Sequence, residues 1–127
     1  MPAAVCTLKR RPEFLRIAAK GKKSVTPGLV LQACRHAHSC APVRYGLTAS
    51  RRVGGAVQRN RARRRLREAA RAVLPVHAAA GHDYVLIARA ATVRRPYALI
   101  VQDLEKALKK LNLWREPDSL NGATAGQ

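Results

Sequence analysis

Carboxylates are the side chains that a metal-dependent hydrolase would need, and this sequence of 127 residues contains seven of them. Cleavage of a phosphodiester by divalent ions requires several carboxylates gathered around those ions. Here they are scattered along the chain: Glu13, Glu68, Asp83, Asp103, Glu105, Glu116 and Asp118. Even Asp103 and Glu105 project about 200° apart on a helix, and Glu13 and Asp83 are isolated in the sequence. We therefore expect no catalytic residue in the protein itself.

Cysteine and histidine gather once, at Cys34, His36, His38 and Cys40, and all four are zinc-ligand types. On a continuous strand, residues of one face are ~6.5 Å apart, so four of them could not reach one tetrahedral ion. Only a tight loop would bring them together, so we expect no bound metal. Three cysteines at irregular spacing also make no disulfide framework, which favours a reducing cytoplasm.

Arginine is the residue type whose density needs an explanation, because nine arginines fall within residues 51–71. In a helix, the pairs 59/63, 61/65, 63/67 and 67/71 place like charges one turn apart, each costing roughly 0.2–0.5 kcal/mol. Only Glu68 offsets this repulsion. Because guanidinium groups match phosphate geometry with two parallel hydrogen bonds, the run indicates a phosphate-bearing partner.

The net charge of +18 supports a polyanionic partner for the whole protein. A membrane is not expected as that partner, because the longest apolar runs are far shorter than the ~20 residues of a membrane span. No secretory segment is expected either. The hydrophobic content of 47% is enough for one modest core. We expect one α/β domain over residues 1–113 and a disordered tail over residues 114–127.

Apolar spacing and turn residues predict the elements that position the arginines. Helices are predicted at residues 12–20, at about 56–74 and at about 96–113, and Pro75 should end the second. Strands are predicted at 29–37, 43–50 and 83–89, the last of them nearly all apolar and therefore central.

The arginine helix has two distinct faces when it is projected at about 100° per residue. The apolar residues fall on one stripe of the width that packs on a core: Ala62, Leu66, Ala69, Ala70 and Val73. A second, polar row is offset by about a quarter turn: Asn60, Arg64, Arg67 and Arg71. Arg61 and Arg65 point to the far side of the helix. The projection predicts a helix that is docked on a core and exposes its polar row.

The strand-to-helix junction carries the sequence Val53-Gly54-Gly55-Ala56-Val57-Gln58-Arg59-Asn60-Arg61. Together with its flanks over residues 44–68, it resembles the signature of the bacterial ribonuclease P protein subunit. Leu8-Lys9-Arg10, Glu13-Phe14 and the apolar residues 83–89 resemble further parts of that family. The resemblance covers about residues 8–112.

The resemblance implies an α+β fold, a two-layer α/β sandwich with a four-stranded mixed sheet and three helices, similar to a ribosomal-protein domain. The arginine helix would form a left-handed βαβ crossover, although general rules alone favour a right-handed one. The resemblance also implies a holoenzyme that is an endoribonuclease of tRNA 5′ maturation. Its catalytic RNA would cleave the 5′ leader from precursor tRNA, with Mg²⁺ bound mainly by the RNA partner and the substrate.

Site residues follow from the same resemblance, position by position. RNA-binding residues would be Arg51, Arg52, Arg59, Asn60, Arg61, Arg63, Arg64, Arg67 and Arg71. A cleft for the single-stranded leader would be lined by Phe14, Ile17, Val30, Gln32, Thr48 and Arg89. Phe14 would stack on a base, although packing against Ile17 explains this aromatic residue equally well.

The sequence departs from the family pattern at Ala18, where many members carry a second aromatic residue, at Gln32, where some carry Tyr, and at Gly55, where Asn is common. We therefore expect weaker stacking on the leader and a larger contribution from charge.

Two other classes of protein share the basic charge. A general or ribosomal RNA-binding module would not need the junction sequence at residues 53–61. A DNA-compacting protein would bind duplex through phosphate contacts alone. We expect no DNA partner.

Overall fold

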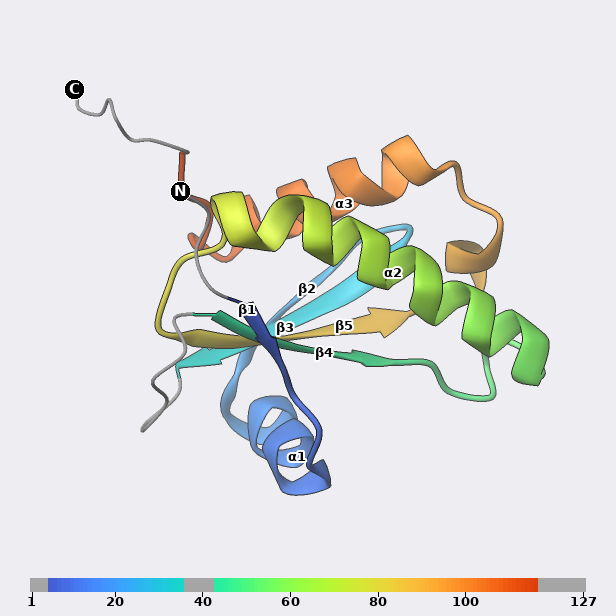
Figure 1. Cartoon of the computed structure of the whole chain (residues 1–127), viewed down its shortest axis with the longest axis horizontal. Helices are drawn as coiled ribbons and strands as arrows, with labels where there is room; N and C mark the ends of the chain where they lie inside the picture. The colour runs from blue at the N-terminus through green and yellow to red at the C-terminus, as the bar shows by residue number, and fades with distance from the viewer. Residues whose placement is uncertain (1–4, 36–42, 117–127) are drawn as a thin grey trace.

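The computed structural model describes residues 5–35 and 43–116 (Figure 1). In chain order the elements are β1 (Val5–Thr7), α1 (Arg11–Lys20), β2 (Lys22–Val25), β3 (Leu29–Arg35), β4 (Val43–Thr48), α2 (Ala56–His77), β5 (His82–Ala88), the 3-10 helix η1 (Ala90–Val93) and α3 (Tyr97–Lys110). The α+β class is confirmed, and so are the three predicted α-helices.

The five strands form one mixed sheet in the order β1-β4-β5-β3-β2. β4 pairs in parallel with both β1 and β5, whereas β3 is antiparallel to β5 and to β2. The expected number of four strands was therefore wrong by one. The elements missing from the predicted ranges, β1 and β2, have only three and four residues, too few for an alternating pattern to be recognised.

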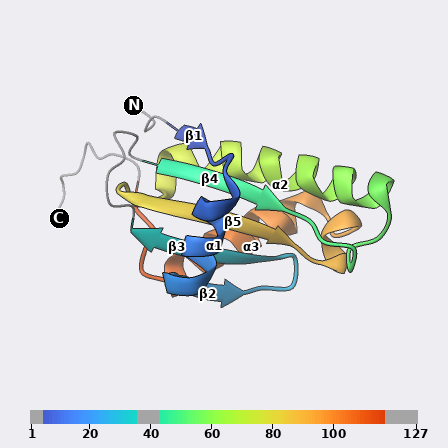
Figure 2. The ribbon, with the colours of Figure 1, turned by 90° about the horizontal axis from the view of Figure 1, so that it is seen from below.

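The connection from β4 to β5 is a left-handed crossover, as the family resemblance implied. Seen from the side of α1, β4 lies above β5, both strands run to the right, and α2 returns behind the sheet (Figure 2). This handedness is uncommon among parallel connections. As a result α2 lies along one face of the sheet with its N-terminus beyond the end of β4.

The main core lies between the sheet and the helices α2 and α3, which cover the same face (Figure 1). Inward residues of the three central strands alternate with outward ones: Leu29, Leu31, Ala33, Val43, Tyr45, Tyr84, Leu86 and Ala88. The shorter α1 covers part of the opposite face, where Ile17 packs with Leu8 and Val85 in a second, smaller cluster. The sheet thus has one fully covered face and one partly covered face.

The helix α2 continues past Pro75 to His77, so the predicted end at residue 74 was wrong. Proline removes one intrahelical hydrogen bond, but the helix resumes its pattern, since Ala78 N–H donates to Leu74 O at 3.1 Å. The end of the helix is also held by Trp114, whose ring stacks on His77 with 3.9 Å between centroids. Burial of Leu74 and this stack favour the helical continuation.

The C-terminal part of the domain extends slightly beyond the expected boundary at residue 113. Trp114 forms an isolated antiparallel bridge with Ala78, and Arg115 N–H donates to His77 O at 2.6 Å. The helix α3 ends at Lys110, earlier than predicted, and Asn112 follows with a φ of 61°. Three predictions fall at least partly outside the described residues: the part of the predicted tail 114–127 that follows residue 116, the last two residues of the predicted strand 29–37, and the residues His36, His38 and Cys40.

Candidate nucleic-acid interface

The two predicted faces of α2 are confirmed. All five residues of the apolar stripe are buried against the sheet and α3, and Leu74 joins them. The polar row, Asn60, Arg64, Arg67 and Arg71, is exposed along its whole length. Burial of the stripe therefore fixes the rotation of the helix and leaves one row of polar side chains free to meet a ligand.

The positive charge of α2 is not neutralised within the described part of the chain. The first turn of the helix contains no acidic residue, and the ion pairs formed by described residues involve Arg16, Arg44 and Arg95 but no arginine of α2. Glu68 is exposed on the same helix. The like-charge repulsion predicted from the sequence therefore persists in the folded domain, where an external polyanion would relieve it.

Two arginines of α2 contact η1 and its flank. Arg61 Nε donates to Val93 O at 3.2 Å, and Arg65 Nε donates to Thr92 O at 3.0 Å. The guanidinium of Arg65 also donates to Arg95 O. The projection placed both arginines on the far side of the helix but missed this contact, because η1 is too short to give a periodic sequence signal. Arg61 is a predicted RNA-binding residue, and part of its guanidinium is therefore occupied by a hydrogen bond within the protein.

The remaining predicted RNA-binding arginines lie at the start of α2 and before it. Arg51 and Arg52 are exposed in the turn after β4, where Arg52 N–H donates to Ser50 Oγ. Arg63 donates from Nη1 to Asn60 Oδ1 at 3.0 Å. Arg59 is half-buried, and its buried Nε has no hydrogen-bond partner among the described residues. Together with the exposed row, these side chains form one basic surface that extends from the turn before α2 along the helix to Arg71.

The predicted leader-cleft residues lie on or near the sheet face that carries α1. Val30, Gln32 and Thr48 are half-buried there, on the side of their strands opposite the main core. Phe14 packs on Gly46 so closely that a Cβ at position 46 would overlap the ring, so this position of the ring requires a glycine there. Ile17 was wrongly assigned to the cleft lining, because its side chain is completely buried with Leu8 and Val85.

Arg89 differs from the other predicted cleft residues in being tied to a neighbouring loop. The residue itself is exposed just after β5. Its Nη1 donates to Thr26 O at 2.6 Å. The guanidinium is thus held close to the strand ends, with part of its surface open to solvent.

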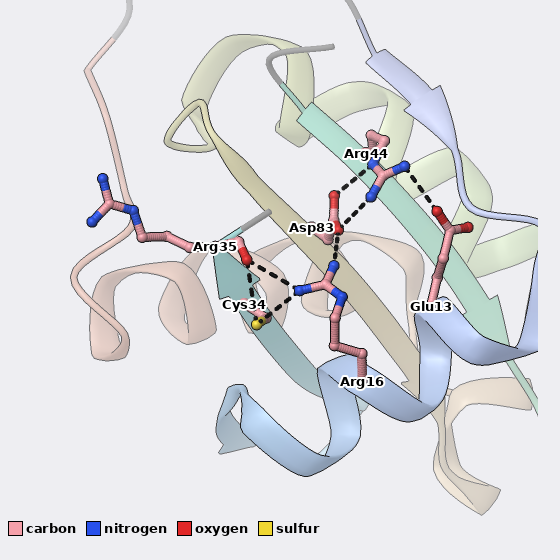
Figure 3. A network of polar contacts seen from close by, with 6 residues as sticks. All are labelled: Glu13, Arg16, Cys34, Arg35, Arg44 and Asp83. Carbon is pink, nitrogen blue, oxygen red and sulfur yellow. Dashed lines mark hydrogen bonds and ion pairs between the residues drawn. The ribbon is translucent and has the colours of Figure 1, made fainter. Parts of the chain in front are cut away.

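A network of ion pairs attaches α1 to the sheet (Figure 3). Asp83 is completely buried and accepts hydrogen bonds from Arg44 at 2.7 Å on each oxygen, and from Arg16 Nη2 at 2.5 Å. Arg44 Nη1 also donates to Glu13 Oε2 at 2.9 Å, and hydrogen bonding to Asp83 raises the pKa of Arg44. Glu13 and Asp83 are isolated in the sequence, but the fold joins them through Arg44.

This network accounts for two of the carboxylates that a metal site would need. Both are occupied by guanidinium groups, which compete with a cation for the same oxygens. Within residues 5–35 and 43–116, no cluster of three or more His, Cys, Asp or Glu side chains could hold a metal ion. None of the described helices is long and apolar enough to cross a membrane.

A small α+β domain whose longest helix buries an apolar stripe and exposes unneutralised arginines belongs to the class of nucleic-acid-binding proteins. The sequence profile of the family named Ribonuclease P matches residues 3–112. The chain therefore belongs to the ribonuclease P protein family, whose members are the protein component of the holoenzyme that removes the 5′ leader of tRNA precursors.

Similarity to individual proteins extends over most of the chain. The ribonuclease P protein component of Paramagnetospirillum magneticum is 50% identical over 114 residues, which make up 87% of this chain and 86% of that protein. The ribonuclease P protein of Staphylococcus aureus has a TM-score of 0.71 at 26% identity, covering 86% of this chain and 97% of that one. The protein from Thermotoga maritima has a TM-score of 0.67 at 27% identity, covering 83% and 94%. RNA binding and tRNA processing follow from membership of this family.

Proposed function

We propose that α2 binds the catalytic RNA of ribonuclease P through its exposed row, Asn60, Arg64, Arg67 and Arg71, with Arg51, Arg52, Arg59, Arg61 and Arg63 contributing at its N-terminal end. The observation that carries this proposal is the exposure of the row on a helix whose charges have no acidic partner among the described residues. Arginine forks bind phosphate oxygens in pairs, so the row matches a nucleic-acid backbone.

The single-stranded 5′ leader of precursor tRNA is proposed to lie on the sheet face beside α1. Val30, Gln32 and Thr48 provide a half-buried surface there, bounded by Phe14 on one side. Arg89 lies near the strand ends and can contact a phosphate with the part of its guanidinium that Thr26 does not occupy. Because Ala18 and Gln32 replace aromatic residues of other members, stacking contributes less here and charge contributes more.

The protein is proposed to position RNA and to reduce its charge repulsion, leaving the hydrolysis to the RNA. Neutralisation by arginine lowers the concentration of Mg²⁺ that the RNA needs, while the Mg²⁺ ions of the reaction are held mainly by the RNA partner and the substrate. The carboxylates Glu13 and Asp83, bound to Arg44, take no part in this proposal as metal ligands. The cytoplasm, where precursor tRNA is made, is the proposed location.

Reconstitution at low Mg²⁺ tests this proposal. Cognate catalytic RNA and precursor tRNA are incubated at a Mg²⁺ concentration at which the RNA alone is nearly inactive, with and without the protein. We expect the protein alone to cleave nothing and the protein with its RNA to restore leader removal. Binding to RNA without this rescue would favour a general RNA-binding module, and preference for duplex DNA would favour a DNA-compacting protein.

A further inference from the structure

β1 lies beside only the first part of β4, so the edge of β4 is free beyond the point at which β1 ends (Figure 2). A small pocket lies at this free edge. It has a volume of about 250 Å³ and is lined by Thr7, Leu8, Phe14, Tyr45, Gly46, Leu47, Arg63 and Arg67. These residues come from β1 and the residue that follows it, from α1, from β4 and from α2, so the pocket lies between the α1 face and the arginine helix. No predicted site residue other than Phe14, Arg63 and Arg67 belongs to it.

The edge of β4 inside this pocket has unpaired backbone groups. β1 pairs with β4 only over Val43–Tyr45, and the last contact is Leu8 N–H donating to Tyr45 O at 2.7 Å. In a parallel ladder alternate residues direct both backbone groups to the same side, so Leu47 directs its N–H and its C=O to the side of Tyr45 O. No described residue bonds either group. The pocket therefore holds a free donor next to a free acceptor.

Aromatic and cationic groups complete the pocket. The ring of Phe14 lies over Gly46, which has no side chain to cover the strand edge. Arg63 is oriented by its hydrogen bond to Asn60, and Arg67 is exposed one turn further along α2. A planar apolar surface, a donor–acceptor pair and two guanidinium groups match the three parts of a nucleotide: the faces of its base, the edge of its base, and its phosphate.

We propose that this pocket binds one nucleotide of a single-stranded RNA segment. Its base meets the main chain of Leu47 and the ring of Phe14, and its phosphate meets Arg63 and Arg67. A volume slightly below the roughly 300–1,000 Å³ of sites for drug-sized ligands suits a single base. The inference rests on the proposed function, since it adds a base-binding subsite at the main chain of Leu47, between the leader surface bounded by Phe14 and the arginines of α2.

The nucleotide can come from the 5′ leader or from the catalytic RNA, because the pocket borders both proposed surfaces. Phe14 bounds the surface proposed for the leader. Arg63 and Arg67 also line an open hollow on the outer surface of α2, the helix proposed to bind the catalytic RNA, together with Val57, Asn60, Arg61 and Arg64. The chemistry is the same for both sources. Binding measurements with the two RNAs separate them.

A pair of substitutions on β1 tests the subsite without removing any charge. Thr7→Trp fills the pocket, whereas Cys6→Trp adds the same bulk at the neighbouring exposed residue, which does not line it. Circular dichroism and thermal unfolding first establish that both variants fold. Dissociation constants are then measured for catalytic RNA with protein alone, and for precursor tRNA and mature tRNA with the holoenzyme.

We expect Thr7→Trp to weaken one of these affinities by about 5-fold or more, the loss that displacement of one stacked base produces, and Cys6→Trp to change none of them. A loss confined to precursor tRNA identifies a leader nucleotide, and a loss for catalytic RNA identifies a nucleotide of that RNA. Equal affinities of the two variants for all three RNAs would overturn the proposal. Low-Mg²⁺ rescue by the wild-type protein, measured in parallel, reports separately on the proposed function.

The amide of Leu47 gives a second, independent readout. Hydrogen exchange of the full-length protein is followed by NMR with and without a short single-stranded RNA of leader sequence. Exchange at Leu47 should slow on binding, while Gly46, already paired in the ladder with β5, serves as the control. Unchanged exchange at Leu47 with saturating RNA would contradict the contact with the main chain.

Discussion

Arg65 donates from Nε to the carbonyl oxygen of Thr92 at 3.0 Å, which joins the middle of α2 to η1. The same guanidinium reaches Arg95 O, and Thr92 Oγ1 donates in turn to Gly28 O at 2.6 Å. An arginine from the basic run is therefore part of the structural framework of the domain. Its neighbours on the exposed row have no such contacts among the described residues.

Replacement of Arg65 should separate stability from RNA binding. Arg65→Ala leaves the carbonyls of Thr92 and Arg95 without their donor and should lower the free energy of unfolding by about 1–3 kcal/mol. Arg71→Ala, on the exposed row of the same helix, should change it by less than about 0.5 kcal/mol. Urea unfolding measures both values. Equal stabilities of the two variants would show that the contact with η1 contributes nothing.

The buried carboxylate of Asp83 should be essential for the attachment of α1. Asp83→Asn removes the charge that Arg16 and Arg44 share, leaving two guanidinium groups poorly compensated near the sheet. Loss of one partner of a buried ion pair typically costs about 3–5 kcal/mol. Urea unfolding should show this loss. Asp103→Asn, which removes the charge that Arg95 pairs with, serves as a comparison in the other half of the domain. A loss below about 1 kcal/mol would mean that the network is largely solvated.

Alkaline pH should destabilise the domain through Tyr84. Burial raises the pKa of Tyr84 above its ordinary value of 10.0, and its hydroxyl donates to Ala79 O at 2.7 Å. Above pH 10 the unfolded chain loses this proton while the folded protein keeps it, so stability falls with rising pH. The slope is about 1.4 kcal/mol per pH unit for one proton. Tyr84→Phe should be less stable at pH 8 but should lack this part of the decline; an identical decline in both proteins would contradict the assignment to Tyr84.

The sequence alone correctly predicts features that repeat along a helix or a strand. The stripe from Ala62 to Val73 and the row from Asn60 to Arg71 follow from a rotation of about 100° per residue, and both occur in the structure. Contacts between distant segments could not be predicted in this way. Arg44 joins Glu13 to Asp83, which are 70 residues apart in the sequence. The 3-10 helix η1, which accepts a hydrogen bond from Arg65, is too short to give a periodic pattern in the sequence.

Local packing explains two further differences from the predictions. Proline commonly ends helices, so the sequence predicts that α2 ends at Pro75, yet packing of Leu74 and the stack of His77 on Trp114 favour continuation. The family resemblance implies that Ile17 lines an open cleft, but its complete burial excludes this role. The open edge of β4 at Leu47 could not be anticipated, since it depends on where the three-residue strand β1 stops.

The salt dependence of binding tests most directly whether the exposed row of α2 binds RNA through phosphates. Dissociation constants for cognate catalytic RNA are measured over a range of salt concentrations for the wild-type protein, Arg64→Ala, Arg67→Ala and the control Lys106→Ala, an exposed residue of α3. Each arginine variant should bind more weakly and reduce the slope of log K against log salt by roughly 0.7–0.9, with no change for Lys106→Ala. Slopes equal to that of the wild type for both arginine variants would contradict the account.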